Sequence, residues 1–352
     1  MSEPAASLPA TMRAAVFRST GGPDVLEVVE RPVPAPGPGE VLVRITVSGV
    51  NPTDWKTRQG LTATGAGGTE QGVHHDGAGR VVAVGPGVGQ ERVGQRVWTW
   101  LAAWRRPGGT AQEYVALPAD RAVPLPEGVG DDVGAVIGVP ALTAHRALTV
   151  AEGGPERLEP GALAGATVLV AGGAGAVGHA AVELARWAGA TVVATTSTEE
   201  KAALARAAGA HHVVLRTADD AAEQVRALAP DGVDVVVEVA PAANAALDLA
   251  VCRQAATVAY YANEGGDELV LPVRGSMSLN LRWQGILLYT VPGRAAAAAV
   301  EACSAAAAAG ALRVGEAAGL PLHRFPLEQV AEAHAAVEAR AVGKVLVDVA
   351  PE

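Results

Sequence analysis

The hydrophobic pattern of the first third of the chain is that of a β-rich domain. Short runs of aliphatic and β-branched residues, such as Val41-Leu42-Val43-Arg44-Ile45, are separated by turns rich in glycine and proline, such as residues 32–39. β-branched residues favour strands, and clusters of glycine and proline mark turns. Strands are predicted at residues 14–17, 41–45, 81–84 and 96–100. No long helical pattern occurs before about Asp131, so this part is predicted to form antiparallel β structure.

From residue 166 onward, strand-like and helix-like patterns alternate. Strands are predicted at residues 168–170, 191–194, 212–215 and 233–237, and helices at residues 180–187, 199–208 and 220–228. A further helix (327–339) and strand (344–349) lie close to the end of the sequence. Such alternation is typical of βαβ units around a parallel sheet. We therefore predict an α/β protein in which a β-rich domain is interrupted by a Rossmann-type, doubly wound parallel-sheet domain.

Composition and charge restrict the partners. The chain has 352 residues, enough for two domains, and 49% hydrophobic against 18% charged residues allow a large core. A net charge of −10 and a pI near 5.3 argue against nucleic acid and anionic lipid, both of which call for a basic surface. The longest uncharged stretch, residues 162–182, is interrupted by glycines, so no membrane span is predicted.

Two further features concern the compartment. Residues 1–11 lack the basic start and apolar segment of a secretion signal, and they are expected to form a flexible tail. The two cysteines, Cys252 and Cys303, lie far apart without CxxC spacing, which favours a reducing compartment. We therefore predict a cytoplasmic protein.

A glycine motif follows the first strand of the Rossmann-type segment. Its residues are Gly173, Ala174, Gly175, Ala176, Val177 and Gly178, which match GxGxxG. The motif directly follows a buried strand and opens a helix, where glycines let backbone N–H groups approach a pyrophosphate. The alternative is a glycine turn that only packs helix on strand. The context favours a dinucleotide site.

The end of the second strand favours NADPH over NADH. NAD sites typically place a carboxylate there, about 20 residues beyond the glycine motif, to bind the ribose 2′-hydroxyl. This chain has Thr195-Thr196-Ser197 instead, small hydroxyl side chains that leave room for a 2′-phosphate, although Glu199 and Glu200 act against it. The residues predicted to hold the phosphate are Thr196, Ser197, Lys201 and Arg216.

Lysine is rare in this chain. Its three lysines are Lys56, Lys201 and Lys344, whereas arginine is the common cation. A lysine kept in such a sequence can mark a place where a compact, titratable ammonium matters. For Lys344, a solvated surface position is an open alternative.

Several further segments resemble the medium-chain dehydrogenases/reductases. They are residues 49–56 (GVNPTDWK), 75–79 (HDGAG), 138–148 (GVPALTAHRAL), 287–290 (LLYT) and 326–347 (PLEQVAEAHAAVEARAVGKVLV). Their order and spacing are similar to the quinone oxidoreductase and ζ-crystallin branch. The resemblance implies a GroES-like catalytic domain (residues 12–137 and 306–352) broken by a Rossmann domain (138–305). It also implies an active site in the cleft between them and a homodimer formed through the edges of the Rossmann sheets.

The resemblance bears on metal binding. Zinc alcohol dehydrogenases of this superfamily hold a catalytic zinc with a cysteine, a histidine and a second cysteine, and the corresponding positions here are Asn51, His75 and approximately Val139. Catalytic zinc needs about three protein ligands. No cysteine precedes Cys252 to form the structural zinc lobe. We predict no metal site, and we interpret His75 as a hydrogen-bonding or packing residue.

The branch implies an NADPH-dependent quinone oxidoreductase. Without a Lewis acid, an activated acceptor such as a quinone is easier to reduce than a simple carbonyl, and the protein supplies orientation and polarisation. By resemblance, Asn51 and Thr143 lie near the nicotinamide. Lys56 occupies a position where many relatives have a tyrosine, and it is predicted either to donate a proton or to pair with Asp54.

Three tyrosines remain open. Tyr260 and Tyr261 follow a strand that ends where the family approaches the nicotinamide, so each is a candidate for the pocket wall or for packing at the strand end. Tyr289 is interpreted as structural. Alternative functions are an NADPH-dependent reductase of enones or enoyl thioesters, with a carrier protein as partner, and a non-catalytic NADPH-binding protein.

Overall fold

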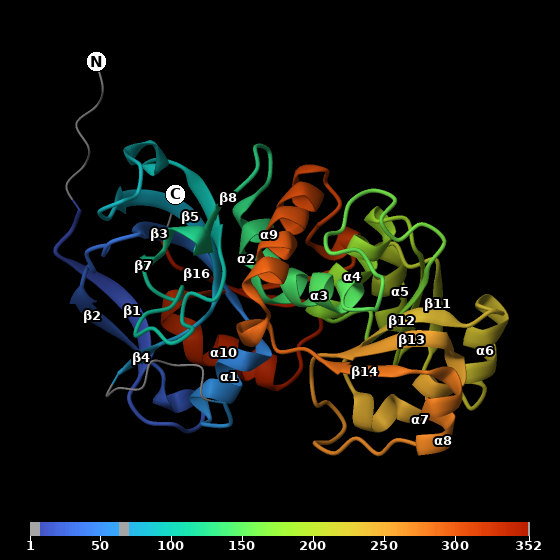
Figure 1. The fold of residues 1–352 in the computed structure, drawn as a ribbon. Coiled ribbons are helices and arrows are strands. Elements are labelled where there is room, and N and C mark those ends of the chain that lie inside the picture. Colours follow the sequence, from blue (N-terminus) through green and yellow to red (C-terminus); the bar gives the residue numbers. More distant parts are fainter. Residues whose placement is uncertain (1–7, 63–69, 351–352) are drawn as a thin grey trace.

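The computed structural model describes residues 8–62 and 70–350. Residues 1–7 of the predicted N-terminal tail lie outside the described residues, and β1 (Thr11–Phe17) begins next to the predicted start of the fold. Figure 1 shows two domains side by side, the first formed by the N-terminal third together with the C-terminal segment, the second by the residues between them. We call them the β-rich domain and the Rossmann domain.

The β-rich domain is built around a seven-stranded sheet. Its order is β15-β16-β3-β5-β6-β8, with β7 also paired to β3. The strands are β3 (Glu40–Val50), β5 (Asp76–Val84), β6 (Arg96–Thr99), β7 (Tyr114–Pro118), β8 (Ala122–Pro124), β15 (Leu322–Pro326) and β16 (Lys344–Asp348). A smaller sheet contains β2 (Glu27–Pro32), β1 and β4 (Gln71–Gly72). Because β16 lies antiparallel to β3, the C-terminal segment rejoins the first domain, as predicted.

The Rossmann domain contains six parallel strands in the order β11-β10-β9-β12-β13-β14. They are β9 (Thr167–Ala171), β10 (Thr191–Thr196), β11 (His212–Leu215), β12 (Val233–Glu238), β13 (Cys252–Tyr260) and β14 (Arg282–Gly285). The direction of strand addition reverses between β9 and β12, and ligands of such sheets bind at this point, outside the carboxyl ends of the strands.

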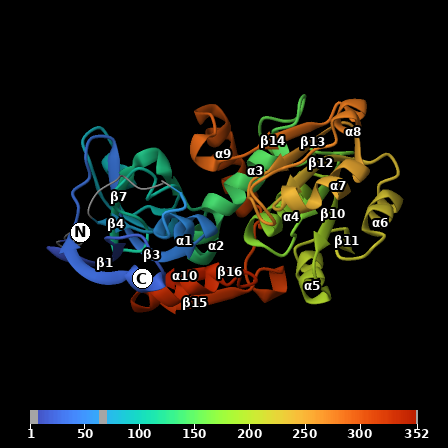
Figure 2. The same ribbon diagram turned by 90° about the horizontal axis from the view of Figure 1, so that it is seen from below.

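Helices lie on both sides of this sheet (Figure 2). They are α4 (Ala176–Trp187), α5 (Glu199–Ala207), α6 (Ala221–Leu228), α7 (Pro241–Val251) and α8 (Val273–Leu279). The predicted start of α4 at residue 180 was four residues late. The glycines at 175 and 178 resemble a turn in sequence, whereas only Gly175 stands outside the helix, as its N-cap.

Helices also connect the domains. The junction consists of α2 (Asp131–Val136), a π-helical turn at Ile137–Ala141 and α3 (Leu142–Thr149). Proline at position 140 lacks the N–H that a regular α-helix requires, which agrees with the irregular turn. The domain boundary predicted between residues 305 and 306 falls inside α9 (Gly293–Ala308), which packs against α3 and α4.

The largest core cluster extends from one domain to the other. It joins Trp98 and Leu101 of the β-rich domain to α3, α4, α9 and the Rossmann strands. Trp98 is fully buried in this cluster. Two further helices, α1 (Pro52–Arg58) and α10 (Val330–Glu338), pack against each other in the β-rich domain. Within residues 8–62 and 70–350, no helix combines the length and apolar character needed to cross a membrane.

Candidate active site at the domain junction

The glycine loop lies between β9 and α4, at the carboxyl edge of the Rossmann sheet. Gly175 is the N-cap of α4, and no side chain occupies the helix N-terminus by hydrogen bonding. A Cβ on Gly178 would lie 2.2 Å from the carbonyl oxygen of Gly172, whereas a Cβ on Gly175 would meet nothing closer than 3.5 Å. Gly178 is therefore required by packing, while Gly175 leaves space before the N–H groups of the helix. Both features fit a pyrophosphate.

The residues predicted to hold a 2′-phosphate gather at the ends of β10 and β11. Lys201 Nζ donates to Ser197 Oγ at 3.3 Å. The backbone N–H of Arg216 donates to the Thr196 carbonyl at 2.9 Å, and the Arg216 side chain is exposed beside them. The Thr196 hydroxyl is buried and donates to the Thr198 carbonyl, so it is directed away from a ligand. Ser197, Lys201 and Arg216 remain candidates for holding a 2′-phosphate.

One of the two acidic neighbours of this set is paired with a cation. Glu199 accepts a hydrogen bond from Arg206 on the same helix, α5, at 2.5 Å. Both side chains are exposed, so this ion pair reduces the repulsion between Glu199 and a 2′-phosphate only in part.

Asn51 lies in a buried polar network instead of an open pocket. Its Nδ2 donates to Asp76 Oδ2 at 2.7 Å, and its Oδ1 accepts from Lys344 Nζ at 2.6 Å. The backbone N–H of Val139 donates to Asp76 Oδ1 at 2.8 Å, which ties the network to the junction turn. Lys344 is 2% exposed. The interpretation of Lys344 as a surface residue is therefore wrong.

Burial controls the protonation of this network. Desolvation raises the pKa of Asp76 to about 6, although Lys344 and the Asn51 amide act in the opposite direction. Desolvation also lowers the pKa of Lys344, while Asp76 and Asp54 raise it. For Asp54, which accepts a hydrogen bond from the Asn51 backbone N–H at 2.7 Å, burial raises the pKa to about 8. At neutral pH the ammonium is thus the counter-charge of the buried Asp76 carboxylate, while Asp54 is mostly protonated.

Lys56 does not pair with Asp54. Its Nζ donates to Asn263 Oδ1 at 3.0 Å and lies 5.7 Å from the centroid of the Trp55 ring. Asn263 belongs to the loop after β13, so Lys56 connects α1 of the β-rich domain to the Rossmann domain. Of the two predicted roles, proton donation and pairing with Asp54, the second is therefore wrong.

The remaining predicted residues lie on the Rossmann side. Thr143 is buried on α3, which packs against β12 and β13. Tyr260 ends β13, and its ring lies over Gly285 of β14, where an added Cβ would come within 3.2 Å of it. Tyr261 packs against the shared core, and burial, followed by the charge of Glu238, raises the pKa of its phenol. Tyr261, more than Tyr260, is placed at the junction.

An aromatic cluster at the junction was missed by sequence reasoning. Tyr289, in the turn after β14, stacks on Trp104 with ring centroids 4.7 Å apart and meets His75 at 5.2 Å. Trp104 and His75 belong to the β-rich domain, so the cluster crosses the cleft. Burial lowers the pKa of His75 to about 3, which keeps its imidazole neutral. The available signal was the scarcity of aromatic residues, 3% of the chain.

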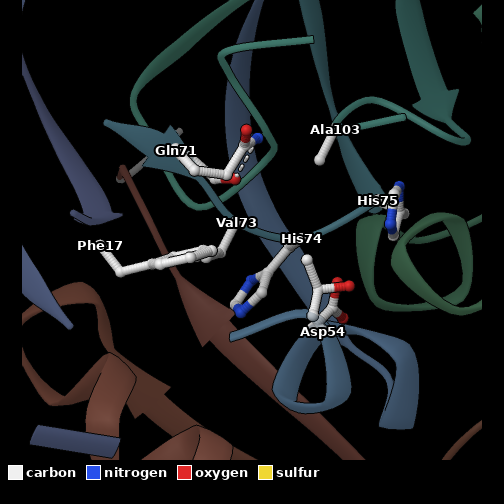
Figure 3. Close-up of a pocket in the computed structure, with 9 residues that line it drawn as sticks. Phe17, Asp54, Gln71, Val73, His74, His75 and Ala103 are labelled. Carbon is white, nitrogen blue, oxygen red and sulfur yellow. Dashed lines mark hydrogen bonds between the residues drawn. The ribbon is translucent and has the colours of Figure 1, made fainter. Parts of the chain in front are cut away.

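A small cavity lies behind this cluster (Figure 3). It is lined by residues that include Phe17, Asp54, His74, His75 and Ala103, and its volume is about 10 Å³. Figure 3 shows His75 on the far side of the cavity from Phe17. Such a volume holds about one water molecule. The cavity is therefore not the place for a cofactor or an organic substrate.

Comparison with known proteins identifies the family. The pattern described as "Alcohol dehydrogenase GroES-like domain" matches residues 37–127, and that described as "Zinc-binding dehydrogenase" matches residues 176–305. A 2-haloacrylate reductase of Burkholderia sp is 35% identical, over 79% of this chain and 80% of the relative. A quinone oxidoreductase of Lama guanicoe is 33% identical, over 92% of each chain. The chain belongs to the quinone oxidoreductase branch of the medium-chain dehydrogenase/reductase family.

Solved structures agree with this assignment. A mycobacterial structure determined in complex with NADPH is 30% identical to this medium-chain reductase and covers 96% of this chain and 99% of its own, with a TM-score of 0.78. The predicted family, the α/β fold with its GroES-like and Rossmann domains, and the assignment as an oxidoreductase are thus confirmed.

The donor set of this medium-chain reductase does not fit a catalytic zinc ion. At the three positions where zinc-dependent relatives have ligands, His75 is the one metal-binding side chain, because the Asn51 amide is engaged by Asp76 and Lys344, and Val139 offers only its backbone. Across residues 8–62 and 70–350, no group of three or more His, Cys, Asp or Glu side chains is placed to hold a metal.

Proposed function

We propose that this chain reduces quinones with NADPH and without zinc. The observation that carries the proposal is the similarity to quinone oxidoreductases. The quinone oxidoreductase of Lama guanicoe aligns with 92% of this chain, which includes both domains. The unmatched donor set at Asn51, His75 and Val139 supports a reaction that needs no Lewis acid. When bound, NADPH supplies the hydride.

The chain's own residues bind and orient the cofactor. The N–H groups at the start of α4 would hold the pyrophosphate, and Ser197, Lys201 and Arg216 the 2′-phosphate. Thr143 and Tyr261, at the junction, would line the nicotinamide end. The Asn51 amide would act through Lys344 and Asp76, by fixing the strands that form the wall of the cleft. Lys56 remains the candidate proton donor, because its ammonium bridges the two domains through Asn263.

The proposal is tested by following the absorbance of NADPH with phenanthrenequinone as acceptor, in buffer containing a metal chelator. Rapid turnover that is insensitive to the chelator is the expected result. Absence of turnover with quinones, despite tight NADPH binding, would contradict the proposal and favour the binding-only alternative. Loss of turnover on chelation would contradict the zinc-free chemistry.

A second candidate function is reduction of an activated C=C bond. The observation that favours it is the 35% identity to a 2-haloacrylate reductase. A simple enone and a 2-haloacrylate, assayed beside the quinone, decide between the two functions by the ratio of their kcat/KM values. If the enone is preferred, Lys56→Met is expected to lower kcat about a hundredfold or more, which is within the range of general acid catalysis.

Cofactor choice gives a separate prediction. Lys201→Ala is expected to raise the Kd of NADPH about tenfold and to leave that of NADH unchanged, because a charge-assisted hydrogen bond to the 2′-phosphate contributes about 1.5 kcal/mol or more. Arg226→Ala, at an exposed cation in the last turn of α6, is the matched control. Nucleotide titration by fluorescence is the measurement. If Lys201→Ala raises the Kd of NADPH and of NADH equally, Lys201 does not contact the 2′-phosphate.

A homodimer formed through the Rossmann sheets belongs to the same proposal. Strand β14 is the last strand of the sheet, and in the described part of the chain it pairs only with β13. An open edge of this kind is a ready surface for pairing with a second copy. The predicted cytoplasmic location stays a prediction.

A further inference from the structure

Two buried polar atoms face the junction from opposite domains without a partner. They are the phenol oxygen of Tyr289 and the Nδ1 atom of His75, neither of which makes a hydrogen bond of good geometry with the described residues. Thr53 is close enough to the phenol to oppose the rise in its pKa, but burial dominates. Unpaired buried polar groups are costly, so each such pair in a folded protein calls for an explanation.

Tyr289 lies at the carboxyl edge of the Rossmann sheet, just after β14. The parallel strands β13 and β14 end at Tyr260 and Gly285, and the N–H of Ile286 donates to the Tyr260 carbonyl at 2.8 Å. Tyr289 follows within one turn, at Leu288–Thr290. It therefore lies at the carboxyl edge of the sheet, where doubly wound domains bind their ligands. From that edge its ring reaches across to the β-rich domain.

The opposite wall is fixed by a strained loop. Leu101 and Arg105 have positive φ angles of 51° and 55°, a conformation that costs a non-glycine residue free energy. Between them, the Ala102 N–H donates to the His75 carbonyl at 3.1 Å, and Trp104 presents its face to Tyr289. The loop thus fixes the positions of Trp104 and His75 relative to each other, beside the phenol. Strain of this kind is concentrated at functional sites.

We propose that the Tyr289 phenol donates a hydrogen bond to the carbonyl oxygen of the acceptor, with neutral His75 as the second polar contact. The inference rests on the proposed function and adds its acceptor subsite. Trp104, stacked on Tyr289 and covered by the Arg105 guanidinium, holds the phenol in place. Burial raises the pKa of the phenol, so Tyr289 remains protonated and able to donate throughout the neutral range.

The reaction balances with Tyr289 as donor of a hydrogen bond, not as the source of a proton. A quinone receives a hydride, that is two electrons and one proton, from NADPH, and one further proton that comes from solvent directly or through Lys56, giving hydroquinone and NADP⁺. Negative charge develops on the acceptor oxygen before that proton arrives. A fixed neutral donor stabilises this charge, in the manner of an oxyanion hole.

The test is Tyr289→Phe, which keeps the ring stack and removes the O–H. We expect kcat/KM for phenanthrenequinone to fall about a hundredfold, mostly in kcat, because loss of one oxyanion donor has effects of about that size. The Kd of NADPH and the thermal midpoint are expected to stay unchanged. Tyr114→Phe on β7, away from the junction, is the matched control. Quenching of tryptophan fluorescence by the quinone without NADPH reports acceptor binding independently of turnover, and it should weaken in Tyr289→Phe.

Three outcomes would overturn the inference. A Tyr289→Phe variant within twofold of the wild type in both kcat/KM and quinone quenching shows that the phenol does not meet the acceptor. Parallel loss of NADPH affinity and thermal stability assigns Tyr289 to structure. If Tyr289→Phe does not fold, His75→Leu replaces it as the probe, and an unchanged KM for the quinone rejects the subsite. A wild type inactive on quinones and enones is a different result, because it contradicts the proposed function itself.

Discussion

Lys344 carries a charge in the protein interior, where desolvation of a charged group costs free energy. It is 2% exposed, its Nζ donates to the Asn51 amide at 2.6 Å, and it lies 4.0 Å from Asp76 Oδ2. Gly343, immediately before it, forms a parallel bridge with Gly175 of the dinucleotide loop. The network behind the cleft and the cofactor loop are thus joined through two consecutive residues. A buried ammonium with two carboxyl neighbours is stable only while its partners remain.

Lys344→Met tests this dependence. The substitution keeps most of the volume but leaves Asp76 buried without a cation, so we expect the free energy of unfolding to fall by about 3 kcal/mol at neutral pH. Without Lys344, which lowers the pKa of Asp76, that pKa rises further above about 6. The carboxyl group is then neutral at lower pH, so the loss of stability relative to the wild type should shrink as pH falls from 7.5 to 5.

Urea denaturation of both proteins across this pH range is the measurement. Lys201→Met, at a partly exposed lysine, is the control and should change the stability by less than about 0.5 kcal/mol at every pH. A loss in Lys344→Met that is independent of pH would mean that packing, not the charge of Asp76, controls the effect.

Contacts between the predicted site residues were predictable only where they are local in sequence. Ser197, Lys201 and Arg216 lie within two successive βα units, and the family pattern of these units places them together. Asn51 and Lys344, by contrast, are 293 residues apart. Their contact follows from the pairing of β16 with β3, which no local pattern encodes. The same holds for Tyr289 and Trp104, which meet only because the two domains close on each other.

At the scale of elements, two glycines at the start of α4 have different roles: Gly178 is required for packing, and Gly175 leaves space for a ligand. Gly178→Ala would place a Cβ 2.2 Å from the Gly172 carbonyl oxygen, so the loop must shift, and we expect a loss of about 2 kcal/mol in the free energy of unfolding. Gly175→Ala meets nothing closer than 3.5 Å, and its φ of −81° suits alanine. It should fold normally but bind NADPH at least tenfold more weakly, because the methyl group occupies the approach of the pyrophosphate.

Thermal unfolding and NADPH titration of the two variants are expected to give opposite patterns. Gly178→Ala should lower the thermal midpoint, and Gly175→Ala only the affinity. If Gly175→Ala binds NADPH as well as the wild type, the pyrophosphate does not approach the backbone at this position, and the site drawn from the motif would be wrong.

The accuracy of the predicted bounds differed between elements, for physical reasons. β11 was predicted with both its bounds, His212–Leu215, because a short β-branched run between turns has little freedom. The start of α4 was missed because glycine in its first turn looks like a loop residue. The π-helical turn at Ile137–Ala141 follows from Pro140 together with the hydrogen bond from Val139 to Asp76, a contact over 63 residues that a sequence pattern does not contain.

At the scale of the whole molecule, the Rossmann sheet leaves the β14 edge unpaired among the described residues. Beside the open edge of β14, three apolar side chains are largely exposed: Val270 is 81%, Val273 72% and Met277 70% exposed. Val273 and Met277 belong to α8, which packs on β13, the neighbour of β14. Apolar residues of this size gathered at a sheet edge are typical of an interface between subunits. The same surface is where the family resemblance implies the homodimer.

The dimer is tested by charge at this surface. A double substitution, Val273→Asp with Met277→Asp, is expected to convert a dimer into a monomer, because two carboxylates per subunit would be buried without partners at a two-fold interface. Leu228→Asp on α6, at the β11 side of the sheet, is the matched control for an exposed apolar residue, 37% accessible, and should leave the dimer intact. Sedimentation equilibrium over a range of concentrations distinguishes the monomer from the dimer.

The cofactor loop lies at the carboxyl edge of the strands, not at the β14 edge, so NADPH affinity should be retained in the monomer. A wild type that sediments as a monomer, or a double variant that stays dimeric, would mean that this sheet edge is not the interface and that its apolar residues serve another contact.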